Sequence, residues 1–194
     1  TSAVATKLAM DEYGIENVLP IYFAIDSAHQ DNVRFKKECE EWYGREIITE
    51  RSPEKYKDQF DVIKKDKYVN GPSGARCTLV LKKKVRQRLE RELEYDGQVF
   101  GFEYSKKEIN RAIRFKEQYP DAKPLFPLIE HKMNKPESLH YLEQHAGIER
   151  PAMYKLGYGN NNCIGCVKGG MGYWNKIRVD FPDHFNKMAK AERE

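Results

Sequence analysis

The sequence lacks the long apolar run that a membrane-spanning helix requires. No apolar stretch in its 194 residues approaches the roughly 20 residues needed to cross a bilayer. No secretory signal is recognisable either. The mean hydropathy is -0.81 and 33% of the residues are charged. We therefore expect a soluble protein that has no membrane partner.

Cysteine is also scarce. The four cysteines lie at positions 39, 77, 163 and 166, and this irregular spacing does not form the disulfide framework of a small secreted protein. We expect a cytoplasmic protein whose thiols are kept reduced for metal binding or catalysis. Hydrophobic residues make up 40% of the chain and aromatic residues 12%, which suffices for a core and excludes wholesale disorder. We find neither internal repeats nor a low-complexity linker.

Apolar runs of strand length alternate with helical patterns over residues 18–129. Strands are expected at 18–25, 46–49, 98–104 and 125–129. Helices are expected at 3–13, 33–43, 54–65, 79–93, 106–117, 136–145, 174–179 and 183–193. This alternation predicts an α/β fold, a doubly wound parallel sheet of about five strands with helices on both faces. Because the chain opens on a helix, we expect the first strand of the sheet to precede Thr1. We expect a nucleotide-binding domain over 1–150 and an irregular cysteine-containing segment over 151–194.

Polar residues follow the first expected strand. Ligands of doubly wound sheets bind beyond the carboxyl ends of the strands, so Asp26 and Ser27 are candidate site residues. The Asp26 carboxylate can bind a ribose hydroxyl or a metal ion, or it can cap the next turn. Thr1 and Ser2 begin a helix, whose free N–H groups form an anion site for phosphate or an ordinary N-cap.

Three of the four cysteines, Cys77, Cys163 and Cys166, form the most informative pattern of the chain. Residues 160–170 read NNNCIGCVKGG, which places Cys163 and Cys166 in a glycine-rich turn. Two such thiolates can face one centre, and Cys77 can close a soft-metal or iron–sulfur site. A redox pair, half a zinc site and two small buried residues are the alternatives. Arg76 and Lys82 concentrate positive charge where a thiolate or an anionic nucleotide would need it.

The order of these features resembles the phosphoadenosine phosphosulfate (PAPS) reductase family, within the PP-loop group of adenine nucleotide α-hydrolase-like enzymes. That family carries a Ser-Gly-Gly-x-x-Ser loop, and Thr-Ser at 1–2 is similar to its last two positions. An Ile-Asp-Thr-Gly-like motif ends the family's second strand, and Ile-Asp-Ser-Ala at 25–28 is similar to it. The resemblance covers nearly the whole chain and implies a crevice for an adenine nucleotide, which is PAPS, APS or ATP. The nucleotide-binding residues implied are Thr1, Ser2, Asp26, Ser27, Arg76 and Lys82.

The cysteine motifs add to the resemblance. The family's Cys-Cys-x-x-x-Lys motif is similar to the run from Cys77 to Lys82, and its Pro-Leu is similar to the pair at 127–128. Its Leu-Tyr-x-x-Gly-Tyr followed by Cys-x-x-Cys is similar to residues 153–166. The resemblance thus implies that Cys77, Cys163 and Cys166 bind a [4Fe–4S] cluster, with zinc as the alternative.

The chain departs from the family pattern at three places. The Ser-Gly-Gly is absent, Thr78 stands where cluster-binding relatives carry a second cysteine, and no cysteine follows Cys166. The family's reductases carry a nucleophilic cysteine in a C-terminal Glu-Cys-Gly segment. Three thiolates would leave one iron of a cluster open, as expected in related tRNA-thiolating enzymes, where that iron can carry sulfide.

The resemblance implies an enzyme of sulfur metabolism. The expected reactions are reduction of a sulfonucleotide or ATP-dependent sulfur transfer. The alternative is a non-catalytic nucleotide- or metal-binding subunit of a nucleic-acid thiolation complex. Partners implied are a thiol reductant or a sulfur donor protein, and a nucleic acid in the thiolation case.

Overall fold

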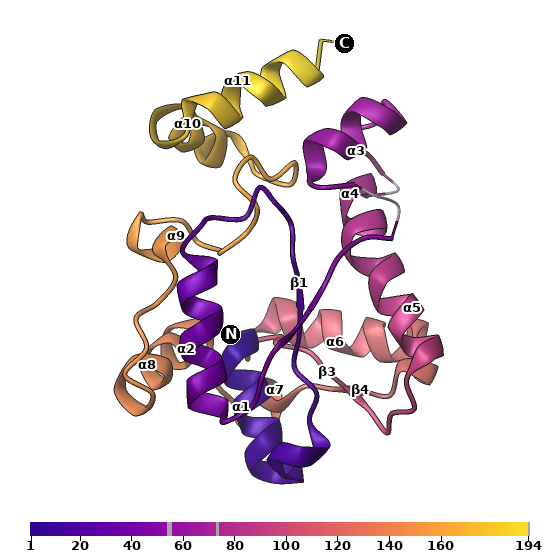
Figure 1. The fold of residues 1–194 in the computed structure, drawn as a ribbon, viewed down its shortest axis with the longest axis vertical. Helices are drawn as coiled ribbons and strands as arrows, with labels where there is room; N and C mark the ends of the chain where they lie inside the picture. The colour runs from indigo at the N-terminus through magenta and orange to yellow at the C-terminus, as the bar shows by residue number, and fades with distance from the viewer. Residues whose placement is uncertain (54–55, 73, 194) are drawn as a thin grey trace. The chain divides into compact units, whose positions relative to one another are not determined.

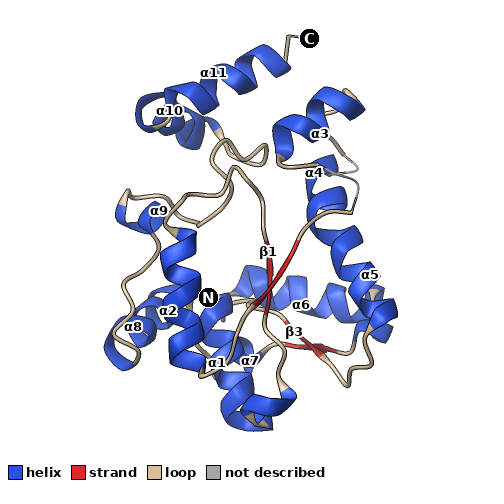
Figure 2. Cartoon of the chain, in the orientation of Figure 1, coloured by secondary structure: helices blue, strands red, loops and turns tan. Residues whose placement is uncertain are grey.

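Helices dominate the structure. The computed structural model describes residues 1–53, 56–72 and 74–193, and Figure 2 shows short strands among many helices. No helix in these described ranges is long and apolar enough to cross a membrane.

Four short strands form two parallel pairs in the described residues. Strand β1 (Ile21–Phe23) pairs with β2 (Ile48–Glu50), and β3 (Gln98–Val99) pairs with β4 (Pro124–Leu125). The strands of each pair are joined through a helix, as parallel strands require. The predicted α/β class is therefore confirmed. A clear doubly wound sheet does not appear among the described residues, because each sheet has two strands there.

The helices begin and end largely where local signals place them. Ser105 accepts the N–H of Glu108 at the start of α6, and Asn134 forms a reciprocal capping box with Glu137 at the start of α8. The helices are α1 (Ser2–Tyr13), α2 (Asn32–Tyr43), α3 (Gln59–Asp66), α4 (Arg76–Thr78), α5 (Lys84–Glu92), α6 (Lys106–Gln118), α7 (Pro127–Glu130), α8 (Lys135–His145), α9 (Ala152–Lys155), α10 (Met171–Asp180) and α11 (Pro182–Ala191). Short 3₁₀ turns cover Ile15–Asn17 and Pro120–Ala122.

Helices α4 and α5 are parts of one helical run. A π-helical turn, Leu79–Lys83, connects them, and Figure 1 shows the run as continuous from α4 into α5. Single π turns inside helices occur frequently at functional sites. This one begins two residues after Cys77 and contains Lys82.

The chain divides into two compact units. Unit 1 comprises Thr1–Ile21, Val33–Ile48 and Leu93–Arg150, and unit 2 comprises Tyr22–Asn32, Thr49–Glu92 and Pro151–Glu194. The chain therefore passes between the units five times. The predicted division into a domain over 1–150 and a segment over 151–194 stays a prediction.

Each unit has its own core. In unit 1, buried residues of α1, α2, α7 and α8 pack together, among them Val4, Cys39, Leu128 and Leu142. A second cluster in unit 1 is aromatic and centres on Phe102 and Phe126.

Unit 2 is built around two smaller clusters. Ile25, Val62, Val80 and Leu81 form the first, against which the side chains of Cys77 and Cys163 pack. The second comprises four buried residues, Met153, Tyr158, Ile164 and Ile177. Both cysteine segments thus belong to the core of one unit.

Several predicted boundaries were wrong. Residues 125–129 were expected to be a strand, but only Leu125 is in β4, and Pro127 starts helix α7. Proline is suited to the first position of a helix because its missing N–H has no intrahelical partner there. The strands predicted at 18–25 and 98–104 shrink to three and two residues.

Other differences concern helices. The helix predicted over 54–65 spans Gln59–Asp66, and its first two predicted positions, 54 and 55, lie outside the described residues. The helix predicted over 79–93 begins earlier, because the helical run already includes Arg76 and Cys77. Helix α9 was not predicted, and the helix expected at 174–179 is longer, spanning Met171–Asp180.

Candidate functional site

The turn that carries Cys163 and Cys166 lies between α9 and α10 in unit 2. Gly165 adopts a φ of 76°, a conformation that glycine reaches without steric cost. The Tyr173 hydroxyl closes the turn. It donates to the carbonyl of Cys163 at 3.1 Å and accepts the N–H of Cys166 at 2.9 Å. One side chain of α10 therefore fixes the backbone at both cysteines.

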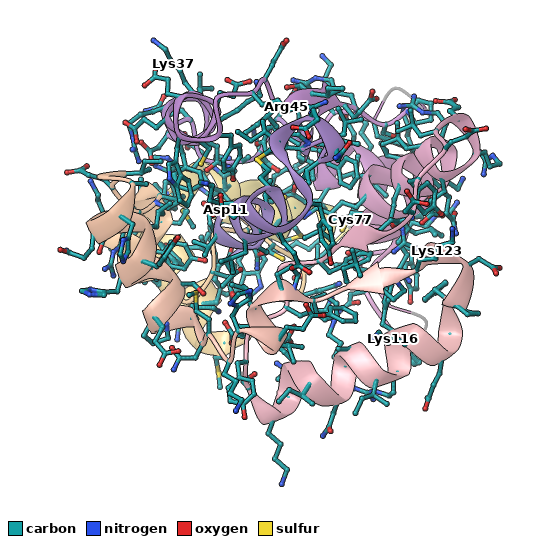
Figure 3. All side chains as sticks on the ribbon, turned by 90° about the horizontal axis from the view of Figure 1, so that it is seen from below. Asp11, Lys37, Arg45, Cys77, Lys116 and Lys123 are labelled. Atoms are coloured by element: carbon teal, nitrogen blue, oxygen red, sulfur yellow. The ribbon has the colours of Figure 1, made fainter. Side chains whose placement is uncertain are left out.

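Cys77 comes from a different element of the same unit. It is the second residue of α4, and Figure 3 labels its side chain. Cys77 and Cys163 pack against the same apolar cluster, which includes Val62 and Val80. All four cysteines are free thiols, and Cys39 belongs to the core of unit 1.

The thiols of the three cysteines act on one another electrostatically. Burial raises the pKa of Cys77 above its usual value, and the nearby Cys166 and Cys163 raise it further. Burial also raises the pKa of Cys163, while the Lys82 ammonium opposes that rise. Cys77 and Cys163 pack against the same apolar cluster, and Cys166 belongs to the same turn as Cys163, so the three residues lie in one neighbourhood of unit 2. We call these three residues the thiol cluster.

The thiol cluster has the donor chemistry of a soft-metal site. Thiolates are the preferred ligands of zinc and of iron–sulfur clusters. No group of three or more His, Cys, Asp or Glu side chains is arranged to hold a metal ion in the part of the chain that the structure describes. Electrostatic effects reach further than the roughly 2.3 Å of a metal–thiolate bond. The three cysteines thus share one neighbourhood, but their sulfur atoms would have to move closer together to bind one metal ion. Metal binding therefore stays a prediction.

Lys82 and Lys168 bring positive charge to the thiol cluster. Burial raises the pKa of Cys163 and of Cys77, and Lys82, on the π-helical turn, and Lys168 offset part of that rise at Cys163 and Cys77 respectively. Both lysines are exposed. Lys82 was a candidate from the sequence, whereas Lys168 was not singled out, although it follows Cys166 by only two positions.

The loop after β1 contacts the cysteine turn directly. The carbonyl of Ser27 accepts the N–H of Ile164 at 2.8 Å, and the Ser27 hydroxyl donates to Oε1 of Gln59. Nε2 of Gln59 donates to the carbonyl of Ile164 at 2.8 Å and to that of Gly165 at 3.3 Å. Sequence reasoning missed Gln59 and Tyr173, since neither carries a local signal that points to the cysteines.

The predicted nucleotide-binding residues are distributed over both units. Asp26 is exposed in the loop that follows β1, three residues after the strand ends, and its carboxylate pairs with Arg51 at 2.5 Å. Ser27 is buried, so its hydroxyl serves internal hydrogen bonds. Thr1 is the N-cap position of α1 and Ser2 its first residue, both in unit 1. A crevice shared by Ser2 and Asp26 therefore stays a prediction.

Arg76 is engaged in an ion pair. Its Nε lies 2.6 Å from Oδ2 of Asp66, whose pKa is held below its usual range by Arg76 and by a hydrogen bond from Tyr56. A phosphate at Arg76 would have to compete with Asp66 for the guanidinium. Lys82 is accordingly the better placed of the two predicted cations for an anionic ligand.

Comparisons of this chain with models of protein families, with curated proteins and with solved structures found no match. The functional argument therefore depends on the residues themselves.

Proposed function

We propose that this protein is a PP-loop enzyme of sulfur metabolism, similar to the PAPS reductase family, that binds an adenine nucleotide and transfers sulfur. The carrying observation is that Cys77, from the start of α4, meets the Cys163–Cys166 turn in one unit. The loop that follows β1 adjoins the same turn. A doubly wound sheet and a cytoplasmic location belong to this proposal.

The protonation of the thiols favours metal binding over a redox pair. A cysteine with an ordinary pKa of about 8.5 is mostly protonated at pH 7, and burial raises the pKa of Cys77 and Cys163 further. Half-buried thiols whose pKa values are raised in this way are poor nucleophiles at neutral pH. A bound metal ion deprotonates a coordinating thiol outright, so ligation overcomes the cost that burial imposes.

The residues of the site have distinct roles in this proposal. The thiol cluster would hold a [4Fe–4S] cluster, or zinc as the alternative, and a cluster on three thiolates supplies an open iron for a sulfur ligand. Lys82 and Lys168 would attract an anionic substrate group. Asp26 would accept a hydrogen bond from the ribose of PAPS, APS or ATP. Because the thiols are weak nucleophiles, ATP-dependent sulfur transfer is favoured over direct thiol attack on a sulfonucleotide.

Metal analysis of matched variants tests the role of the thiol cluster. The protein is purified anaerobically, and iron, acid-labile sulfide and zinc are measured in parent, Cys77→Ser and Cys39→Ser proteins. We expect Cys77→Ser to lose most of the bound metal and Cys39→Ser, in the core of unit 1, to retain it. Unchanged metal content in Cys77→Ser would remove Cys77 from the site. Calorimetry with ATP, APS and PAPS tests the nucleotide, and no binding of any of them would overturn the proposal.

A second function is favoured by the charge of the two units. Unit 2 contains 20 Lys and Arg against 13 Asp and Glu, whereas unit 1 contains 14 against 17. The unit with the cysteines is thus strongly basic, as expected for a surface that meets a nucleic-acid backbone. The protein would then be a nucleotide- or metal-binding subunit of a nucleic-acid thiolation complex, with a sulfur donor protein as partner. Nucleotide turnover by the isolated protein would contradict a non-catalytic role.

A further inference from the structure

A closed ring of hydrogen bonds joins the loop after β1 to the cysteine turn. The backbone of Ser27 accepts from Ile164, the Ser27 side chain donates to Gln59, and the Gln59 amide donates back to Ile164. The three residues come from three separate segments of unit 2, namely the loop, helix α3 and the cysteine turn. Each member therefore contacts both of the others.

The ring is buried. Ser27 is 4% exposed, Gln59 2% and Ile164 6%. Opening any one of these bonds would leave a polar group unpaired away from water, which is costly compared with an exposed hydrogen bond. The loop after β1 and the cysteine turn are consequently expected to keep one mutual arrangement or to lose it together.

Two ligand sites depend on this arrangement, if the function proposed above holds. Asp26 precedes Ser27 and faces solvent, at the position where an adenine nucleotide is expected. Cys163 directly precedes Ile164, so the residue that bonds to both Ser27 and Gln59 is the neighbour of a metal-ligand candidate. A nucleotide that holds the loop therefore also stabilises the arrangement of the cysteine turn.

We infer that nucleotide binding at the loop after β1 and the state of the cysteine turn are energetically coupled, and that Gln59 is the residue that couples them. The coupling is positive because a nucleotide on the loop and a metal on the thiol cluster would both favour the closed ring of hydrogen bonds. Such coupling is reciprocal. Bound nucleotide shifts the equilibrium of the cysteine turn toward its closed arrangement by a certain factor, and closing the turn raises the affinity for nucleotide by the same factor. Gln59 acts here as a positioning residue and touches neither ligand.

Thiol alkylation measures the coupling without any metal. Reduced, metal-free protein is treated with iodoacetamide, and the rate at each cysteine is determined by mass spectrometry with and without saturating ATP, APS or PAPS. We expect the nucleotide that binds to slow alkylation of Cys163 and Cys166 by roughly fivefold or more, the lower end of typical coupling factors. Cys39, buried in the core of unit 1, should stay unmodified with and without nucleotide, which checks that the protein remains folded during the reaction.

Variants separate coupling from simple shielding. Gln59→Leu removes both ring bonds of the amide and should reduce the nucleotide effect to less than roughly twofold. Tyr173→Phe is the matched control, since it removes a hydroxyl that fixes the same turn from α10 but takes no part in the ring. It should raise basal alkylation and retain the nucleotide effect. If Gln59→Leu does not fold, Gln59→Glu replaces it, because the carboxylate lacks the N–H that Ile164 accepts.

The outcomes distinguish the coupling from the function on which it rests. If calorimetry detects no binding of ATP, APS or PAPS, the proposed function and the coupling both fail. If a nucleotide binds but leaves alkylation of the cysteine turn unchanged, the coupling fails and nucleotide binding stands. If protection persists in Gln59→Leu, the nucleotide shields the thiols directly and Gln59 has no coupling role.

Discussion

Substitution of Gly165 by alanine should disrupt the cysteine turn in a measurable way. The φ of 76° at this position costs an alanine about 1–2 kcal/mol relative to glycine. An added Cβ would also lie 3.2 Å from Cζ of Phe60 and 3.5 Å from Cη2 of Trp174, tighter than a comfortable contact on the Phe60 side. Overpacking of this kind costs about 1–3 kcal/mol. We expect a total loss of about 2–5 kcal/mol in the free energy of unfolding, the sum of these two effects.

Gly157 offers a matched control in the same unit. Its φ is 83°, and the nearest atom to an added Cβ is Cε of Lys176 at 3.9 Å, an ordinary contact with a flexible side chain. Gly157→Ala should therefore show only the backbone cost of about 1–2 kcal/mol. Urea unfolding of both variants at pH 7 measures the difference. In addition, Gly165→Ala should lose bound metal while Gly157→Ala retains it.

The result that would refute this reasoning is a small difference between the two variants. If their free energies of unfolding agree within about 0.5 kcal/mol, the usual spread of neutral surface substitutions, packing of Phe60 against Gly165 contributes nothing. An equal loss of metal in both variants would show that the conformation of the cysteine turn is not the sensitive element.

Three further predictions concern stability. Leu128→Ala should cost about 2–5 kcal/mol in urea unfolding because Leu128 is fully buried in unit 1, and a loss below about 1 kcal/mol would contradict its place in the core. Asn134→Ala should cost about 1 kcal/mol by removing the capping box with Glu137, and an unchanged urea midpoint would argue against the cap. The pKa of Asp66 is lowered by Arg76, so its stabilisation is present above the unfolded pKa of about 3.9 and is lost as the pH falls through the lower folded pKa. The free-energy difference between parent and Asp66→Asn should accordingly shrink between pH 7 and about pH 3, and a pH-independent difference would refute the ion pair.

The helices were largely predictable because their signals are local. Helix α2 was expected over 33–43 and spans Asn32–Tyr43, and α6 was expected over 106–117 and spans Lys106–Gln118. Periodicity and capping residues such as Ser105 act within a few positions of the chain.

The strands were less predictable because pairing depends on neighbours. An apolar run such as 18–25 indicates burial, but only Ile21–Phe23 is in the ladder with β2. The run at 125–129 reads equally as a buried strand or a buried helical turn, and Pro127 decides for the helix.

The cysteines of the candidate site were predictable from the sequence, but the residues that hold the cysteine turn in place were not. Cysteine spacing directed attention to Cys77, Cys163 and Cys166, which the structure places in one neighbourhood. Gln59 and Tyr173 hold the turn through hydrogen bonds across the fold. No sequence pattern of nearby residues predicts such contacts.

The interleaving of the two units has a consequence for how the protein is made. Unit 2 needs its last segment, Pro151–Glu194, before its two earlier segments have their partners. At 5–20 residues per second, a ribosome adds Cys163 about 4–17 s after Cys77. During that interval Cys77 and the apolar face of α4 and the π-helical turn lack the cysteine turn that covers them. Assembly of the thiol cluster therefore follows synthesis of the cysteine turn, and any metal shared by the three thiols must be delivered after Cys166 has been added.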